Sequence, residues 1–217
     1  LDGIRWHRAL IAGSNNVLSR EEYLNKINVF PVPDGDTGTN MAFTLTSILE
    51  STTEKVHLDA DKMLAQIADA ALDGARGNSG AILAQFFVGL SESLAGKEKM
   101  SVIDFADAFK NGSDCAWEAL SDPKEGTILT VFKDVANFLI TFTSDKNNDD
   151  FTVVIESCFH ESQKSLNETP EKMALLKKAG VVDAGAQGFV DFLKGINDFI
   201  QSGTIRDLGD IINIAEK

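Results

Sequence analysis

The sequence predicts an all-α protein, and three features of the chain support this fold class. Apolar residues recur every three or four positions over most of the chain, and this spacing gathers them on one face of a helix. No stretch alternates convincingly between apolar and polar residues, as a half-buried strand would. Polar loops rich in glycine separate the apolar stripes. We therefore expect an antiparallel array of helices joined by short loops.

The expected helices follow one another along the chain. Ten ranges have helical periodicity, and we predict eight or nine helices from them, with the first two ranges compatible with one bent helix: 2–16, 19–26, 39–53, 60–74, 79–95, 101–120, 127–143, 150–167, 171–179 and 184–201. Ser19 with Glu22 matches a capping box, and Thr169 before Pro170 matches an N-cap with proline at the first helical position. Residues 151–159 include β-branched side chains that suit a strand, but the length and neighbours of this stretch favour a helix.

Composition limits the classes of function. With 217 residues, 43% of them hydrophobic, the chain can bury one sizeable core. Its 33 acidic and 20 basic residues give a net charge of −13, which repels nucleic acid and anionic lipid. No apolar run approaches the roughly 18 residues of a transmembrane segment, and the start of the chain lacks a signal-peptide pattern. We therefore expect a cytoplasmic protein with no nucleic-acid partner and no transmembrane segment.

The chain is expected to hold one helical domain over residues 1–203, followed at 204–217 by a C-terminal extension or the start of a linker. It begins at Leu1 and shows no natural stop, so we expect a piece of a longer protein. Cys115 and Cys158 lack the spacing of a zinc site or a redox pair, and we expect both to be free thiols.

Four polar loops lead directly into apolar helices. In chain order they read PVPDGDTGTN, DGARGNSGA, SDPKEGT and VVDAGAQGF. Alternate helix ends meet in an antiparallel array, so these loops are expected to share one rim. Helix N-termini carry unpaired N–H groups and partial positive charge, which suits such a rim to an anion such as phosphate.

The first of these loops places Asp34 and Asp36 on either side of Gly35, whose flexibility lets both carboxylates face a common point. Two carboxylates this close repel each other unless a cation lies between them. Oxygen ligands without histidine or cysteine suit Mg²⁺, which fills its remaining positions with water and substrate phosphates. Asn28 is a candidate for an additional amide ligand. The acidic loop therefore predicts a metal-dependent phosphate site.

Each of these features also has a simpler interpretation. An isolated Asp-Gly-Asp is often an exposed turn, and Asn78 or Ser79 can simply cap a helix. Arg76 fits either a phosphate clamp or a solvated surface residue. The three histidines belong to separate regions, and we expect them to be structural or exposed. P-loop, Rossmann and protein-kinase motifs do not occur in the sequence, so phosphoryl transfer would require another scaffold.

Four segments together carry a family resemblance. NVFPVPDGDTGTNM, GARGNSGAILAQFF, EGTILTV and GVVDAGAQGF resemble the signature segments of one nucleotide-binding domain, in matching order over almost the whole chain. That domain is shared by the ATP-binding subunit of bacterial fatty acid kinase and the DhaL-like nucleotide-binding subunit of dihydroxyacetone kinase. The resemblance implies an antiparallel eight-helix barrel, with ATP and two Mg²⁺ ions at one end.

The resemblance also implies roles for individual residues. Asp34 and Asp36 would be the metal ligands and the catalytic residues. The phosphates would lie against Thr37, Gly38, Thr39, Asn40, Asn78, Ser79 and Gly80, and the nucleoside against Thr127, Ile128, Asp183 and Gly185. One departure concerns the second metal ion: the dihydroxyacetone kinase pattern has a third aspartate before the pair, where this chain has Asn28 or Val29. The long first segment is the form associated with the fatty acid kinase branch.

The acceptor chemistry gives a separate comparison of the two branches. A hydroxyl acceptor benefits from a base, whereas a fatty carboxylate, with an acidity like that of a Glu side chain at about 4.3, is already ionised at neutral pH. The loops contain no histidine, so catalysis would depend on positioning and on charge neutralisation by the metal. This chemistry suits acyl-phosphate formation, although in either branch a partner protein could provide the missing groups.

The leading hypothesis is therefore the ATP-binding domain of a fatty acid kinase, which transfers the γ-phosphate to a fatty acid presented by a partner binding protein. The family plan places further domains after this one, and these would allow a homodimer. A dihydroxyacetone-kinase-like phosphotransferase subunit and a non-catalytic ATP-sensing domain are the alternatives.

Overall fold

The computed structural model describes residues 1–144 and 148–202, and every regular element in these ranges is an α-helix. The predicted all-α fold class is confirmed, and the ambiguous stretch 151–159 is helical. The extension expected at 204–217 lies outside the described residues. The helices are α1 (Gly3–Leu18), α2 (Glu21–Ile27), α3 (Thr37–Glu54), α4 (Ala60–Gly74), α5 (Gly77–Ser93), α6 (Val102–Glu118), α7 (Ile128–Thr143), α8 (Phe151–Lys172), α9 (Ala174–Ala179) and α10 (Ala184–Ser202).

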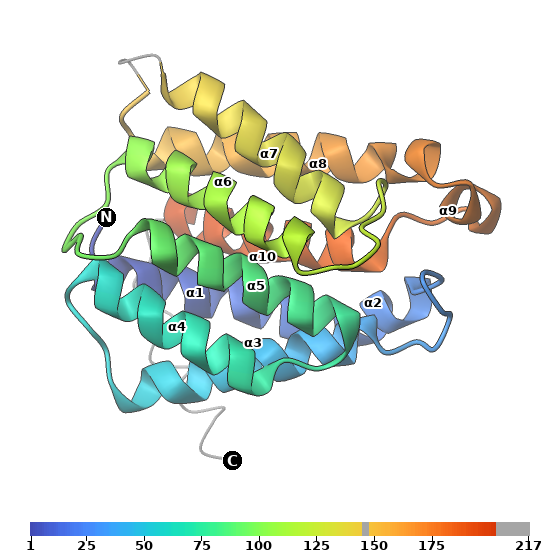
Figure 1. Cartoon of the computed structure of the whole chain (residues 1–217), viewed down its shortest axis with the longest axis horizontal. Coiled ribbons are helices and arrows are strands. Elements are labelled where there is room, and N and C mark those ends of the chain that lie inside the picture. The colour runs from blue at the N-terminus through green and yellow to red at the C-terminus, as the bar shows by residue number, and fades with distance from the viewer. Residues whose placement is uncertain (145–147, 203–217) are drawn as a thin grey trace.

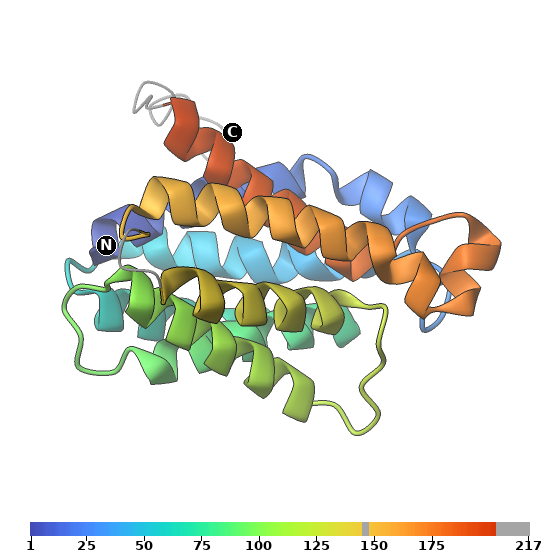
Figure 2. The ribbon, with the colours of Figure 1, turned by 90° about the horizontal axis from the view of Figure 1, so that it is seen from above.

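The long helices run alternately in opposite directions along the longest axis of the molecule (Figure 1). Each packs against the next, α10 packs against α8 and α1, and α1 also contacts α3 and α4, so the series returns to its start. The short helices α2 and α9 both lie at the right-hand end in Figure 1, and the view from above in Figure 2 agrees. Helices α3, α5, α7 and α10 all begin at that end.

Phenylalanine rings from several helices fill the centre of the array. The ring of Phe86 on α5 stacks on that of Phe132 on α7 with centroids 4.3 Å apart. Phe189 on α10 meets Phe132 edge-on at 4.6 Å. All three side chains are buried, so this cluster joins α5, α7 and α10 by non-directional packing across the bundle. None of the helices in the described ranges is long and apolar enough to cross a membrane.

Two predicted helix starts are wrong. The hydroxyl of Ser19 donates to the carbonyl of Asn16 at 2.8 Å, and α2 has no side-chain cap. Ser19 therefore closes the end of α1, and the expected capping box with Glu22 does not form. Its sequence pattern is not specific enough to distinguish the end of one helix from the start of the next, because a serine hydroxyl can also bond back to a preceding carbonyl.

The second wrong start is at Thr169 and Pro170. Helix α8 continues through Pro170 to Lys172, and α9 begins only at Ala174. Proline cannot donate to the carbonyl four residues earlier, but the Thr169 hydroxyl donates to that carbonyl of Leu166 at 2.7 Å. The threonine thus replaces the hydrogen bond that the proline removes, which allows a proline inside the helix.

Two other helices begin earlier than predicted. Helix α3 starts at Thr37 rather than at 39, and α5 starts at Gly77 rather than at 79. The polar residues of the motif loops therefore lie in the first turns of these helices. This difference matters for the site, because the first turn of a helix contains its unpaired N–H groups.

Candidate functional site

A pocket of about 370 Å³ lies at the end of the array where α3, α5, α7 and α10 begin. Loop 28–36, loop 120–127 and the first turns of these helices border it. The structure thus brings together segments that are far apart in the sequence. The predicted site residues that line the pocket are Asn28, Asp34, Asp36, Thr37, Asn40, Asn78, Ser79, Thr127, Ile128, Asp183 and Gly185.

The acidic loop forms one wall. Asn28 is 5% exposed, and its Nδ2 donates to Oδ1 of Asp34 at 2.8 Å. Its Oδ1 is buried without a hydrogen-bond partner, and a buried acceptor left unpaired is costly. Gly35 has a φ of +69°, a conformation that favours glycine. The loop therefore places two aspartates and an asparagine with an unpaired amide oxygen at the border of one pocket.

Two helix N-termini beside this loop are left without a cap from their own N-cap residue. Neither Asp36 at the start of α3 nor Arg76 at the start of α5 makes a side-chain cap bond. The Ser79 hydroxyl lies 3.4 Å from the carbonyl oxygen of Thr37, linking the two first turns. Gly77 has a φ of +55°, and a Cβ there would lie 2.2 Å from Nδ2 of Asn40. The two helix starts therefore approach closely, with their partial positive charge facing the pocket.

The opposite wall is closed by Asp183. Its Oδ1 accepts from the N–H of Ile128 at 3.0 Å and from the N–H of Ala186 at 2.8 Å, so one carboxylate caps both α7 and α10. Burial raises the pKa of Asp183 to about 6, although the backbone N–H groups that it accepts lower it. Thr127 caps α7 as well, through a 3.3 Å bond from the N–H of Leu129.

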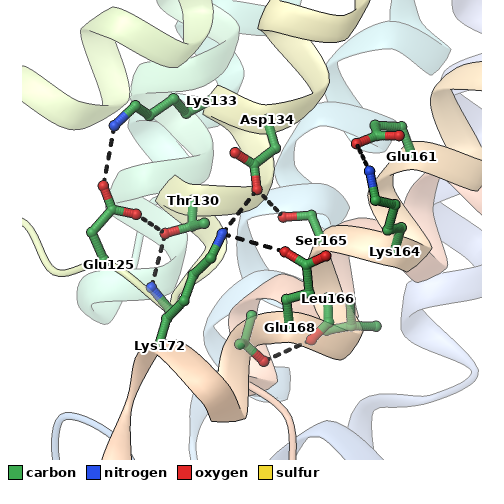
Figure 3. Close-up of polar contacts among 12 residues, drawn as sticks. Glu125, Thr130, Lys133, Asp134, Glu161, Lys164, Ser165, Leu166, Glu168 and Lys172 are labelled. Atoms are coloured by element: carbon green, nitrogen blue, oxygen red, sulfur yellow. Dashed lines mark hydrogen bonds and ion pairs between the residues drawn. The ribbon is translucent and has the colours of Figure 1, made fainter.

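A polar network outside the pocket supports the loop that carries Thr127 (Figure 3). The hydroxyl of Thr130 donates to Glu125 at 2.7 Å and accepts from the N–H of Gly126 at 2.8 Å. Lys133 donates to the other oxygen of Glu125 at 3.1 Å. These bonds fold the loop back onto the first turns of α7, and the hydrogen bond from Thr130 lowers the pKa of Glu125.

A second group of polar contacts connects α7 with α8. Asp134 accepts from the hydroxyl of Ser165 at 2.6 Å and from Lys172 at 3.2 Å. Lys172 also lies 3.7 Å from Glu168 within α8 (Figure 3). Because Asp134 and Lys172 are partly exposed, we expect this group of bonds to fix the relative position of the helices more than to stabilise the fold.

Three predicted site residues do not line the pocket, namely Gly38, Thr39 and Gly80. The Thr39 side chain is instead bonded to α2, through Glu21 at 2.7 Å and Asn25 at 2.9 Å. The two glycines allow close packing behind the pocket: a Cβ at Gly38 would lie 2.3 Å from the carbonyl oxygen of Glu21, and one at Gly80 would lie 2.7 Å from the Thr44 hydroxyl. Their binding roles stay predictions, and their packing roles are visible.

Several lining residues were not predicted as site residues, among them Phe30, Ile82, Leu120, Asp122, Lys124 and Leu129. Of the described residues that line the pocket, Lys124 carries the only positive charge, and it pairs with Asp122 at 2.7 Å. The SDPKEGT loop could have predicted these residues, since it precedes a helix as the other three polar loops do. Arg76 is not among the lining residues, and its guanidinium donates to the Ala75 carbonyl at 2.7 Å.

The oxygen donors of the pocket suit a hard cation. Asp34, Asp36 and Asn28 supply oxygen donors, which match Mg²⁺ better than a softer metal. Burying the unpaired Oδ1 of Asn28 costs free energy, and a bound cation would remove this cost by giving the oxygen a partner. No group of three or more His, Cys, Asp or Glu side chains suited to a metal occurs within the described ranges. Further ligands would therefore have to come from water or a bound phosphate.

The fold and the site together define a class: an all-α domain with an acidic loop and uncapped helix starts around one end pocket. The chain belongs to the DAK2 domain family, whose model matches residues 31–198. Among curated relatives, the protein YloV of Bacillus subtilis is 37% identical over 205 residues, covering 94% of this chain and 37% of that protein. A Staphylococcus haemolyticus protein is 39% identical over 191 residues, covering 86% of this chain and 34% of its own length. This chain thus spans about a third of the length of these relatives.

Solved structures show the same fold. The dihydroxyacetone kinase of C. freundii in complex with AMP-PNP and Mg²⁺ has a TM-score of 0.68 and 17% sequence identity, over 88% of this chain and 33% of that chain. Its native form gives a TM-score of 0.65, over 91% of this chain and 34% of that chain. At this identity the likeness concerns the fold alone.

Proposed function

We propose that this chain is the ATP-binding part of a Mg²⁺-dependent phosphotransferase. The observation that carries the proposal is that Asn28, whose amide oxygen is buried and unpaired, borders one pocket with Asp34, Asp36 and two helix starts that lack their own caps. Family membership and the fold shared with a kinase crystallised with AMP-PNP and Mg²⁺ support the same interpretation.

The residues that line the pocket form two groups, one for the phosphates with their metal ion and one for the nucleoside. Asp34, Asp36 and Asn28 would hold Mg²⁺, which when bound supplies the positive charge that offsets the phosphates. The first turns of α3 and α5, with Thr37, Asn40, Asn78 and Ser79, would bind phosphate oxygens through N–H and hydroxyl groups. The apolar and capped wall around Ile128 and Asp183 would receive the nucleoside. A second ion would depend mainly on phosphate oxygens, because the acidic loop supplies only two carboxylates.

The finer proposal is that the acceptor is a fatty acid carboxylate held by a partner protein, with an acyl phosphate as the product. Among the described residues that line the pocket there is no histidine, and an ionised carboxylate needs no base to remove a proton. Positioning and charge neutralisation would then account for catalysis. A triose acceptor, by contrast, would require a base from elsewhere.

Acceptor choice can be tested directly with the longer natural protein. It would be incubated with ATP, Mg²⁺ and either a fatty acid on its carrier protein or dihydroxyacetone, and acyl phosphate would be trapped with hydroxylamine. We expect a hydroxamate only with the carrier-bound fatty acid, and little turnover by residues 1–217 alone. Phosphorylation of the triose would favour the dihydroxyacetone-kinase-like alternative. ATP binding without turnover on either acceptor would indicate the sensing domain.

A further inference from the structure

Helix α2 contacts the first turn of α3 directly beside the proposed metal site. Oδ1 of Asn25 accepts from the backbone N–H of Thr39 at 3.1 Å, and its Nδ2 donates to the Thr39 hydroxyl at 2.9 Å. We propose that Asn25 acts as the N-cap of α3 in place of Asp36, and thereby keeps the Asp36 carboxylate available to a cation. This inference rests on the proposed metal site and assigns a positioning role to a residue outside the pocket.

The N-cap position of α3 is unusual in its geometry. Thr39 is the third residue of α3, so its N–H is one that an N-cap side chain ordinarily accepts. Asp36 is among the residue types most favoured for this task, yet it makes no cap bond. Its backbone, at φ −117° and ψ −1°, differs from the extended conformation usual for an N-cap. Asn25 fills the vacant role from a different helix.

The orientation of the Asn25 amide is fixed by its partners. The Thr39 hydroxyl donates its proton to Glu21 at 2.7 Å, so it can only accept from Asn25. The amide therefore places its nitrogen at the hydroxyl and its oxygen at the N–H of Thr39. A flipped amide would lose both bonds.

The position of α2 is fixed as well. Arg20, at its start, pairs with the buried Asp191 of α10 at 2.7 Å. At Gly38 a Cβ would lie 2.3 Å from the carbonyl oxygen of Glu21 and 2.9 Å from Oδ1 of Asn25. Only glycine allows this close approach of α3 to α2, which explains why Gly38 lies behind the pocket. A carboxylate that caps a helix gives one of its oxygens to backbone N–H groups and is oriented by them, so the external cap leaves both oxygens of Asp36 free to serve the metal.

The test compares Asn25→Ala with Asn111→Ala. Asn111 is a matched control, since its Nδ2 bridges to a neighbouring helix through the Gly89 carbonyl at 2.7 Å, far from the site. Mn²⁺ is the probe, and its affinity is measured by electron paramagnetic resonance in the presence of ATP. Residues that orient metal ligands typically contribute about 10-fold to 100-fold in affinity. We expect a loss of that size for Asn25→Ala and unchanged affinity for Asn111→Ala, with similar drops in melting temperature.

Two further measurements separate positioning from general stability. In the Asp36→Asn background, Asn25→Ala should weaken Mn²⁺ binding little further, because both changes remove the same ligand. In the metal-free protein, Asn25→Ala should accelerate hydrogen exchange at the Thr39 amide. Wild-type Mn²⁺ affinity in Asn25→Ala, or losses that add in the double variant, would overturn the inference and leave the metal site intact. Failure of the wild type itself to bind Mn²⁺ with ATP would overturn the proposed function, and the inference with it.

Discussion

The two ends of the helical array hold cavities of similar size that differ in how many polar side chains line them. The pocket where α3, α5, α7 and α10 begin, about 370 Å³ in volume, is lined by aspartates, asparagines and small hydroxyl residues as well as apolar ones. The cavity at the other end, about 430 Å³, is lined mainly by aromatic and aliphatic side chains, including Phe105, Phe151 and Phe199. One helical scaffold thus provides an apolar interior at one end and a polar rim at the other.

Helix capping is one part of this difference. At the apolar end, α1, α6 and α8 are capped by their own N-cap side chains, namely Asp2, Ser101 and Asp150, whereas α4 has no side-chain cap. At the polar end, α3 and α5 receive no cap from theirs. All helix starts carry the same unpaired N–H groups, and those of α3 and α5 that their own N-cap residues leave open border the polar pocket. Glycine and small polar residues in the first turns then leave space for a ligand.

The largest effect is expected at the core that the two ends share. Phe132→Ala removes a fully buried ring that contacts both Phe86 and Phe189, and such truncations cost about 3–5 kcal/mol. Urea unfolding followed by circular dichroism would measure this loss. A cost below about 1 kcal/mol would show that the two ends are not coupled through this cluster.

Ser79→Leu should affect the polar end selectively. Ser79 is 9% exposed and lines the pocket, so a leucine would occupy the space of a phosphate. We expect ATP affinity to fall at least ~10-fold, which corresponds to about 1.4 kcal/mol, as measured by calorimetric titration. The control is Ser144→Leu at the exposed end of α7, which should bind ATP normally. Equal affinities in both variants would remove Ser79 from the site.

A pH-dependent contribution should come from Asp183. Its folded pKa of about 6 lies above the ordinary 3.8, so between these values the folded state holds a proton that the unfolded state has released. Its contribution to stability is therefore present below pH 3.8 and is lost as the pH rises through 6. Relative to Asp183→Asn, the wild type should lose about 1 kcal/mol between pH 5 and pH 8 in urea unfolding. A constant or growing difference would contradict this account.

The smallest expected effects come from one matched substitution at each end. Ile82 lines the polar pocket and Ile196 lines the apolar cavity, and both are buried. Replacing either with valine should cost about 0.5–1.5 kcal/mol of stability. Only Ile82→Val should weaken ATP binding, by about fourfold if one methylene contact is lost. Equal effects on ATP binding would mean that the ends are not chemically independent.

The sequence predicted the fold well because apolar periodicity extends over nearly every helix. Its local errors arose where a hydroxyl could bond in two directions, as at Ser19 and Thr169. The convergence of the polar loops followed from antiparallel packing, which is a general property of such arrays. Thr39 and Gly38 contact α2 instead of the pocket. This could not be predicted, because the sequence does not show on which side a second helix packs against the start of α3.

The central claim is that the acidic loop binds ATP through a metal ion. It is tested most directly by thermal unfolding of the wild type, Asp34→Asn and Asp36→Asn with ATP, in Mg²⁺ or in chelator. Asp114→Asn serves as the control, since Asp114 is an exposed partner of Lys110 on α6. A ligand at 100 times its Kd stabilises a protein by about 2.7 kcal/mol. We predict this stabilisation for the wild type and Asp114→Asn in Mg²⁺, and its loss in chelator and in both loop variants. An unchanged rise in melting temperature for Asp34→Asn and Asp36→Asn would contradict the claim.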